Sequence, residues 1–291
     1  VVNSHAQVYT TDNGLPSNGI KGLQWDEKTN FLWIATEAGI VRFNGVDFRS
    51  YTKENMASIS SERMLFMTRN YKDAIYISDL PGNIFTVQES KPVIWKKAAN
   101  NVNPFYSNYY LLAVSDTFFR KYNDTVNTSR FSIVTDKIVR LSDTACLILN
   151  NGTVFFHSIG SKNPVVLPFE KNSFKAIFKI GDNCFLTDTK KRTFLFNKIN
   201  YSLSPVLVAD ELNQSIRFET GNNPVFWEPG MNNPILISGE NAWLFTYNGD
   251  RITAKLIFTG IPSDALIRTI QYSEKNKTLF IGTDSKGLII L

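Results

Sequence analysis

The sequence contains very little cysteine and histidine. Its 291 residues include only two of each, Cys146, Cys184, His5 and His157. This excludes a disulfide scaffold, and no group of Cys, His or carboxylate residues has the spacing of a metal site. Each cysteine lies in an apolar, strand-like stretch, so we expect two buried thiols; a bridge between them would require an oxidising compartment. We expect neither a metal nor a cofactor.

Long apolar runs and clustered charges are also missing. No apolar stretch approaches the roughly 20 residues that span a bilayer, so the sequence predicts no membrane segment. The chain has no initiator Met and no signal-like apolar region, which indicates a mature or excised fragment. The net charge of +5 is spread along the chain, without the basic stripe of a nucleic-acid-binding protein. Diffuse positive charge favours an acidic small molecule or acidic glycan as ligand.

Catalytic motifs are absent as well. The sequence has no glycine-rich phosphate loop, no GxSxG elbow and no HExxH helix. Paired carboxylates, as in glycoside hydrolases, would have to converge from different segments. The candidates lie in predicted hairpins, where Asp usually binds local backbone N–H groups: Asp26, Asp79, Asp116, Asp188 and Asp284. We therefore expect a protein that is not an enzyme, and a propeller-fold polysaccharide lyase or glycoside hydrolase is the alternative.

The most informative feature that is present is an internal repeat. Residues 20–43 read IKGLQWDEKTNFLWIATEAGIVRF, and residues 267–291 read IRTIQYSEKNKTLFIGTDSKGLIIL. The two segments align with a single inserted residue, and a Gly-x-Pro-Ser turn precedes each of them. Such similarity at opposite ends of a chain indicates a repeat architecture.

Each repeat predicts four antiparallel strands. Alternating apolar residues and the Asn44-Gly45 hairpin signal place strands at about 20–25, 31–36, 39–43 and 46–52. Four such strands in about 42 residues are typical of a propeller blade. Middle repeats are weaker and show second and third strands at 74–87, 111–122, 146–158, 184–197 and 235–247. Residues 60–70 fit a first, inner strand, and residues 218–234 a protruding loop. The sequence thus predicts an all-β, seven-bladed β-propeller of four-stranded antiparallel blades in one domain, 1–291.

A short phrase explains how the ring would close. Tyr-Thr-x-x-Asn occurs at Tyr9–Asn13 and again at Tyr51–Asn55, where it ends the outer strand of the first repeat. The last repeat lacks an outer strand because the chain stops at Leu291. The N-terminal strand, residues 6–10, is therefore predicted to pair with the last blade and to remove its open edge.

The repeat resembles a known family. Gly14-Leu15-Pro16-Ser17-Asn18, Leu32-Trp33-Ile34-Ala35-Thr36, Gly39-Ile40 and Arg42-Phe43-Asn44-Gly45 resemble the two-component regulator propeller repeat. The strong match covers the two terminal repeats. The resemblance implies the N-terminal, periplasmic sensor propeller of a hybrid two-component histidine kinase that senses oligosaccharides or polysaccharides. It also implies an adjacent propeller and a β-sandwich domain as partners, with the kinase outside this chain, and a homodimer is a further expectation.

Two kinds of side chain are candidates for ligand contact. Cations follow the apolar start of several inner strands, and we expect them to form a ring at the channel mouth that attracts carboxylate or sulfate: Lys21, Lys175, Arg217 and Arg268, with Arg63 and Arg140 within one residue of that position. The alternative is that they are solvated strand-end residues. Trp227, in the predicted loop, is the aromatic candidate. We expect Trp33, Trp243 and Phe280 in the core, and the core is also favoured for Trp25 and Tyr272.

The predicted role is therefore non-catalytic recognition. A sensor domain would bind a glycan-derived ligand, and the diffuse positive charge favours an acidic one. Binding would shift the packing of the domain against a neighbouring domain or protomer. A pure protein–protein interaction propeller is the second alternative.

Overall fold

The computed structural model describes residues 6–70, 72–97, 137–161, 164–208, 225–226, 228 and 230–291. These residues form β-strands and one short 3-10 helix, η1 (Thr11–Asn13). Among the described residues, no helix is long and apolar enough to cross a membrane. The strands make five sheets, four with four strands and one with eight. The predicted all-β fold of four-stranded antiparallel sheets is thus confirmed. The count of seven blades remains a prediction, because the strands expected at 111–122 lie outside the described residues.

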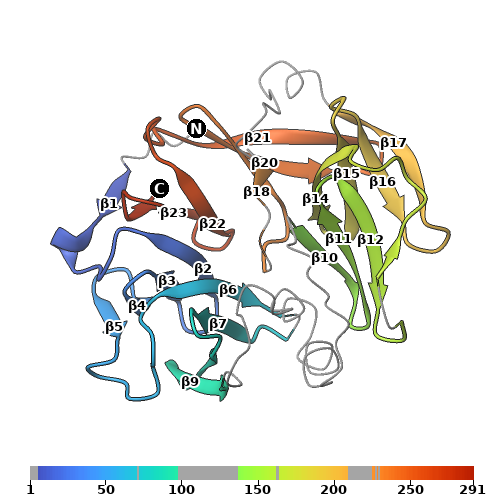
Figure 1. Cartoon of the computed structure of the whole chain (residues 1–291). Coiled ribbons are helices and arrows are strands. Elements are labelled where there is room, and N and C mark those ends of the chain that lie inside the picture. The colour runs from blue at the N-terminus through green and yellow to red at the C-terminus, as the bar shows by residue number, and fades with distance from the viewer. Residues whose placement is uncertain are drawn as a thin grey trace. The chain divides into compact units, whose positions relative to one another are not determined.

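The chain divides into two compact units. The terminal unit holds β1–β9 and β22–β24, and the central unit holds β10–β21. In Figure 1 the strands of the terminal unit are coloured blue to cyan and red, and those of the central unit green to orange.

The first two sheets of the terminal unit follow the predicted pattern. The first consists of β2 (Ile20–Asp26), β3 (Phe31–Thr36), β4 (Gly39–Phe43) and β5 (Phe48–Tyr51). The second consists of β6 (Met64–Arg69), β7 (Ile75–Asp79), β8 (Ile84–Gln88) and β9 (Lys91–Lys96). Residues 60–70 therefore contain a strand, as expected, because Met64 and Met67 supply the apolar residues that the core needs.

The last sheet joins both ends of the described chain. It consists of β22 (Ile267–Ser273), β23 (Thr278–Thr283), β24 (Leu288–Ile290) and β1 (Gln7–Tyr9). β1 pairs antiparallel with β24, and Val8 lies opposite Ile289. The predicted pairing of the N-terminal strand with the last sheet is observed, so β24 has a partner on its outer edge.

The Tyr-Thr-x-x-Asn phrase forms the same turn twice. The backbone N–H of Thr10 donates to Asn13 Oδ1 at 2.9 Å, and that of Thr52 donates to Asn55 Oδ1 at 3.0 Å. Asn binds nearby backbone N–H groups in this way where a chain leaves a strand. The repeated phrase therefore marks two equivalent strand ends, one on β1 and one on β5.

Three sheets of the terminal unit pack side by side through their first strands. β2 lies against β22 on one side and β6 on the other (Figure 1). At the second junction the backbones approach so closely that a Cβ on Gly22 would lie 2.6 Å from Met67 Cβ. At the first, Leu23 of β2 and Phe280 of β23 belong to one apolar cluster. Side chains from neighbouring sheets thus share one core, which makes movement between them costly.

The central unit contains one four-stranded sheet and one eight-stranded sheet. The former is made of β10 (Lys137–Ser142), β11 (Ala145–Asn150), β12 (Thr153–Ser158) and β13 (Val165–Val166). The latter joins two four-stranded groups: β14 (Phe174–Ile180), β15 (Asn183–Asp188), β16 (Thr193–Asn197) and β17 (Ser202–Val208), and β18 (Val225–Phe226), β19 (Ile235–Ser238), β20 (Asn241–Tyr247) and β21 (Arg251–Thr259).

Two features of the central unit differ from expectation. The outer strands β17 and β21 pair in parallel, with Leu207 opposite Arg251 and Val208 opposite Ile252. Part of the predicted loop 218–234 is also a strand: Val225 and Phe226 pair with Leu236 and Ile235. A short apolar run was enough to add a first strand to this group.

Candidate functional site

A β-bulge recurs at the second residue of the first strand in four sheets. In β2, Ile20 lies opposite Thr36 and Gly22 opposite Ala35, so Lys21 has no partner across the ladder. The equivalent extra residues in β6, β14 and β22 are Leu65, Lys175 and Arg268. A bulge redirects the side chain that it carries. The structure thus gives one local geometry to three of the predicted ligand residues, Lys21, Lys175 and Arg268.

Lys21 is bound by carboxylates of two sheets. Its Nζ lies 2.9 Å from Glu37 Oε1 and 4.0 Å from Asp284 Oδ1, and its side chain is only 18% exposed. The hydrogen bond and the charge of Lys21, with a smaller effect from Arg63, hold the pKa of Glu37 below its usual value. Arg63 Nη2 lies 3.9 Å from the same Glu37 oxygen. Lys21 and Arg63 therefore have partners within the protein.

Arg268 and Lys175 differ from Lys21. Both side chains belong to exposed residues. Within the residues that the structure describes, no ion pair involves either of them. Of the predicted cations that the structure describes, these two are the ones that remain available to an external anion.

The other predicted residues fall into two groups. Arg217 and Trp227 lie outside the described residues. Arg140 was expected near the start of its strand, but it lies opposite Cys146 near the far end of β10 and pairs with Asp143 in the turn. The prediction for Arg140 was wrong because the register of this weak repeat was set three residues too late.

Lys137 is the cation of β10 that lies nearest to the bulged position of the other first strands. It lies opposite Leu149 in β11, and Ala176, next to the bulged Lys175, lies opposite Thr187 in β15. When Cys146 is aligned with Cys184, Leu149 falls on Thr187, so Lys137 and Ala176 occupy equivalent positions in their first strands. Lys137 therefore takes the place of Ala176, and the bulged position of this repeat falls one residue earlier, outside the described residues.

The aromatic predictions have mixed outcomes. Trp33 and Phe280 are buried, as expected. Trp243 is only half-buried; it lies on β20, the third strand of its group, whereas Trp33 lies on a second strand, β3. Trp25 is also half-buried and stacks on Phe280 with ring centroids 5.0 Å apart. Tyr272 is half-buried as well, and burial, with the charge of Glu274, raises its pKa.

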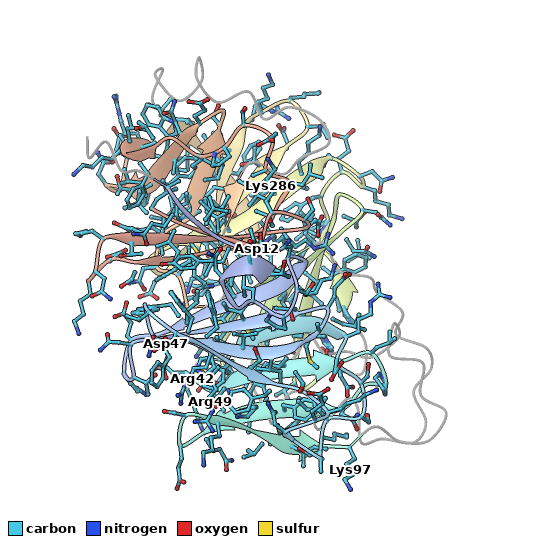
Figure 2. The ribbon with its side chains drawn as sticks, turned by 90° about the vertical axis from the view of Figure 1, so that its left-hand side faces the viewer. Asp12, Arg42, Asp47, Arg49, Lys97 and Lys286 are labelled. Atoms are coloured by element: carbon cyan, nitrogen blue, oxygen red, sulfur yellow. The ribbon has the colours of Figure 1, made fainter. Side chains whose placement is uncertain are left out.

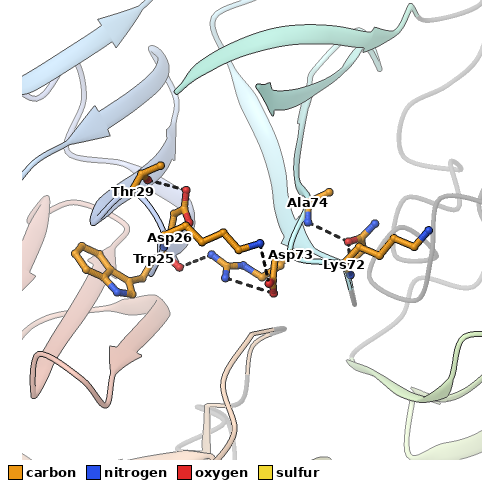
Figure 3. A network of polar contacts seen from close by, with 9 residues as sticks. Trp25, Asp26, Thr29, Lys72, Asp73 and Ala74 are labelled. Atoms are coloured by element: carbon orange, nitrogen blue, oxygen red, sulfur yellow. Dashed lines mark hydrogen bonds and ion pairs between the residues drawn. The ribbon is translucent and has the colours of Figure 1, made fainter. Parts of the chain in front are cut away.

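A second polar network lies at the far ends of β2 and β6. The guanidinium of Arg69 donates to the carbonyl oxygen of Trp25 and lies 3.9 Å from Asp73, which Lys28 also contacts (Figure 3). Gly230, from a distant part of the chain, packs on Arg69, since a Cβ there would lie 3.1 Å from Arg69 Cδ. Burial lowers the pKa of Arg69 below its usual value, and the charges of nearby carboxylates offset only part of this effect. This network joins two sheets and has the character of a structural clamp.

The hairpin carboxylates Asp26, Asp79 and Asp188 bind backbone N–H groups of their own turns, as expected, whereas the side chain of Asp284 lies near Lys21 instead. Asp79 Oδ1 accepts from the backbone N–H groups of Gly82 and Asn83, and Asp188 Oδ1 from those of Lys190 and Arg192. Asp116 lies outside the described residues. In the part of the chain that the structure describes, no cluster of His, Cys, Asp and Glu has the arrangement of a metal site.

Both cysteines are buried free thiols, as expected. Burial raises the pKa of Cys146 far above its usual value and that of Cys184 to about 12. Thiols of this kind are unreactive at neutral pH.

Comparisons with known proteins give a fold but no family. No family model matches the chain, and no curated protein matches it. Among solved structures, the chain is similar to the extracellular domain of BT4673 from B. thetaiotaomicron, described as a one component system, with 12% identity and a TM-score of 0.57. It is also similar to PorZ, a surface component of the type-IX secretion system of Porphyromonas gingivalis, with 8% identity and a TM-score of 0.58.

Each match covers 99% of this chain; it covers 42% of the BT4673 structure and 38% of the PorZ structure. The extracellular domain of BT3049 from B. thetaiotaomicron, described as a hybrid two component system, matches at 15% identity with a TM-score of 0.47, over 98% of this chain and 41% of that one. The chain thus spans about two fifths of the length of these structures. At such identities the likeness concerns the fold.

Proposed function

We propose that this chain is the sensor propeller of a two-component system, and that it recognises a glycan-derived ligand through cations at the starts of its first strands. The observation that carries the proposal is the recurrent bulge, which places Lys21, Lys175 and Arg268 at the same backbone position; Lys175 and Arg268 are exposed there and have no ion pair within the described residues. Repetition of one charged position around a repeat fold is what multivalent recognition of an acidic oligosaccharide requires.

The comparisons support the class of protein. The fold is shared with the extracellular domain of BT4673, and the repeat sequence resembles the two-component regulator propeller family. The proposal therefore includes a periplasmic location, a histidine kinase outside this chain, and a seven-bladed ring closed through β1 and β24. Arg217 and Trp227 complete the proposed site, the tryptophan by stacking on a sugar face.

Signal transmission would come from movement of whole domains. Neighbouring sheets of the terminal unit share their cores, as at Gly22 and Met67, so they are poor hinges. Ligand binding would change how the propeller packs against an adjacent propeller, a β-sandwich domain or a second protomer.

A thermal-shift screen tests the proposal. Acidic oligosaccharides, such as oligogalacturonate and sulfated glycan fragments, are compared with neutral ones, since a ligand that favours the folded state raises the melting temperature. Calorimetry then compares the wild type with an Arg217→Ala/Arg268→Ala variant. We expect the variant to bind acidic glycans about tenfold or more weakly, because charge-assisted hydrogen bonds are lost.

The outcomes separate the alternatives. A panel in which no glycan raises the melting temperature would refute direct sensing and favour an interaction propeller. Release of new reducing or unsaturated ends from a polysaccharide would instead indicate the glycoside hydrolase or lyase.

A further inference from the structure

Two sheets of the terminal unit have the same backbone arrangement around their bulges. In the first sheet, the N–H of Glu37, just after β3, donates to the carbonyl of Gly19, just before β2, at 3.1 Å. In the last sheet, the N–H of Asp284 donates to the carbonyl of Leu266 at 3.0 Å. Glu37 and Asp284 therefore occupy equivalent positions, each beside a bulged cation.

In the first sheet the protein supplies its own carboxylate to this position. Glu37 Oε1 lies 2.9 Å from Lys21 Nζ. The pair shows that a carboxylate fits between the turn after the second strand and the bulged cation.

In the last sheet the equivalent carboxylate is directed elsewhere. Asp284 Oδ1 lies 4.0 Å from Lys21 of the neighbouring sheet, and Arg268 has no ion pair within the described chain. Asp is one methylene shorter than Glu, and the segment between Thr283 and Gly287 has one more residue than the equivalent segment between Thr36 and Gly39. The longer turn also carries Lys286, labelled in Figure 2, which pairs with Asp264. Both nearby carboxylates therefore already have cations.

An exposed apolar residue precedes Arg268 closely in the sequence. Leu266, two residues before Arg268, is 59% exposed and is among the few exposed large hydrophobic residues of the described chain. A cation two residues from an exposed leucine would suit an anion carried on an apolar body, such as the C–H face of a sugar ring.

We propose that Arg268 binds a carboxylate of an external ligand, which takes the position that Glu37 takes beside Lys21. The ligand class is a carboxylated sugar or ring acid, with its apolar face against Leu266. Arg can bind a carboxylate through two parallel N–H donors. This inference deepens the function proposed above and rests on it for the natural ligand, but the site itself is tested independently.

The first experiment uses a matched pair of small probes. Cyclohexanecarboxylate and its neutral isostere cyclohexanecarboxamide are titrated into the whole isotope-labelled chain, with cyclohexyl sulfate as a third probe. Nuclear magnetic resonance follows the Leu266 methyl groups and the backbone amide of Thr269. We expect the carboxylate to bind about tenfold or more tightly than the carboxamide, and the sulfate to bind more weakly than the carboxylate.

Three variants locate the effect. Arg268→Ala is expected to remove the preference for the carboxylate, and Arg268→Lys to restore part of it, since a point charge replaces the two-donor fork. Lys275→Ala removes another exposed cation, at the opposite end of the same sheet, and should leave binding unchanged. Equal affinity for carboxylate and carboxamide, or an unaltered preference in Arg268→Ala, would overturn the proposal.

The two proposals fail separately. If the carboxylate probe binds at Arg268 but no glycan raises the melting temperature, sensing of glycans is refuted and the carboxylate site stands. If glycans stabilise the protein but the probe shows no dependence on Arg268, the sensor function stands and this site is refuted.

Discussion

At the scale of single residues, small polar side chains at the ends of the second strands hold the hairpins closed. Thr36 Oγ1 donates to the carbonyl of Gly39 and Thr283 Oγ1 to that of Gly287, each at 2.9 Å. In the second sheet the equivalent residue is Asp79, which is fully buried. A charged group thus performs the role of a neutral hydroxyl, and its burial has a consequence for stability.

That consequence is a dependence of stability on pH. Burial raises the pKa of Asp79, while hydrogen bonds from Asn83, Gly82 and Ser60 oppose the rise. The folded pKa therefore exceeds the unfolded one, near 3.8. The contribution of Asp79 to the free energy of unfolding is fully present below the unfolded pKa and is lost as pH rises through the folded pKa.

We predict that Asp79→Asn becomes progressively less destabilising, relative to the wild type, between pH 3 and pH 7. The amide stays neutral and keeps an oxygen for the backbone N–H groups of Gly82 and Asn83. Urea denaturation across this pH range measures the difference in the free energy of unfolding. Asp47→Asn, in the exposed β4–β5 turn (Figure 2), controls for the loss of one charge. A difference for Asp79→Asn that does not change with pH would contradict the prediction.

At the scale of elements, the contact between β24 and β1 depends on one glycine. Gly287 has a φ of +74°, and a Cβ there would collide with the carbonyl oxygen of Tyr9. The first sheet repeats the arrangement, since a Cβ on Gly39 would lie 2.6 Å from the carbonyl oxygen of Tyr51. The glycine lets the last turn approach the closing strand.

Gly287→Ala is therefore expected to destabilise the protein by roughly 2–4 kcal/mol, through backbone strain and displacement of β1. Gly45→Ala is the matched control, because it also has a positive φ but has no neighbouring atom within 4 Å of the added Cβ. It should cost only about 1 kcal/mol. Chemical denaturation of the two variants measures both values, and equal losses would show that the contact with β1 is unimportant.

At the scale of the whole molecule, β1 links the beginning of the described chain to its end. Tyr9 packs on Phe43 and Phe48 of the first sheet, with ring centroids 5.3 and 5.5 Å apart, while β1 itself pairs with β24. One strand thus fastens two sheets that lie about 250 residues apart in sequence.

Deletion of residues 1–10 is expected to lower the melting temperature by about 5–10 °C, since the loss of Tyr9 packing and of three paired residues is worth a few kcal/mol. It should also promote aggregation through the exposed edge of β24, visible by light scattering. Deletion of residues 1–5 alone, which leaves β1 intact, is the control. An unchanged melting temperature in the longer deletion would mean that β1 does not fasten the sheets.

Much of this protein follows from the sequence by itself. The strands of the terminal repeats, the turns at Asn13 and Asn55, the hairpin role of Asp79 and the pairing of β1 with β24 depend on local alternation, turn chemistry and an unpaired edge. These are short-range or pattern-based properties, and two strong copies of the repeat made the pattern legible.

Only the tertiary structure decided which cations have partners. Lys21 and Arg268 occupy equivalent bulges, yet one is paired and the other is not, because ion pairing depends on ångström-scale reach between neighbouring sheets. The parallel pairing of β17 with β21 and the packing of Gly230 on Arg69 likewise join segments that no local pattern connects. Such contacts depend on where separate segments meet in space, and hydrophobic periodicity carries no information about that.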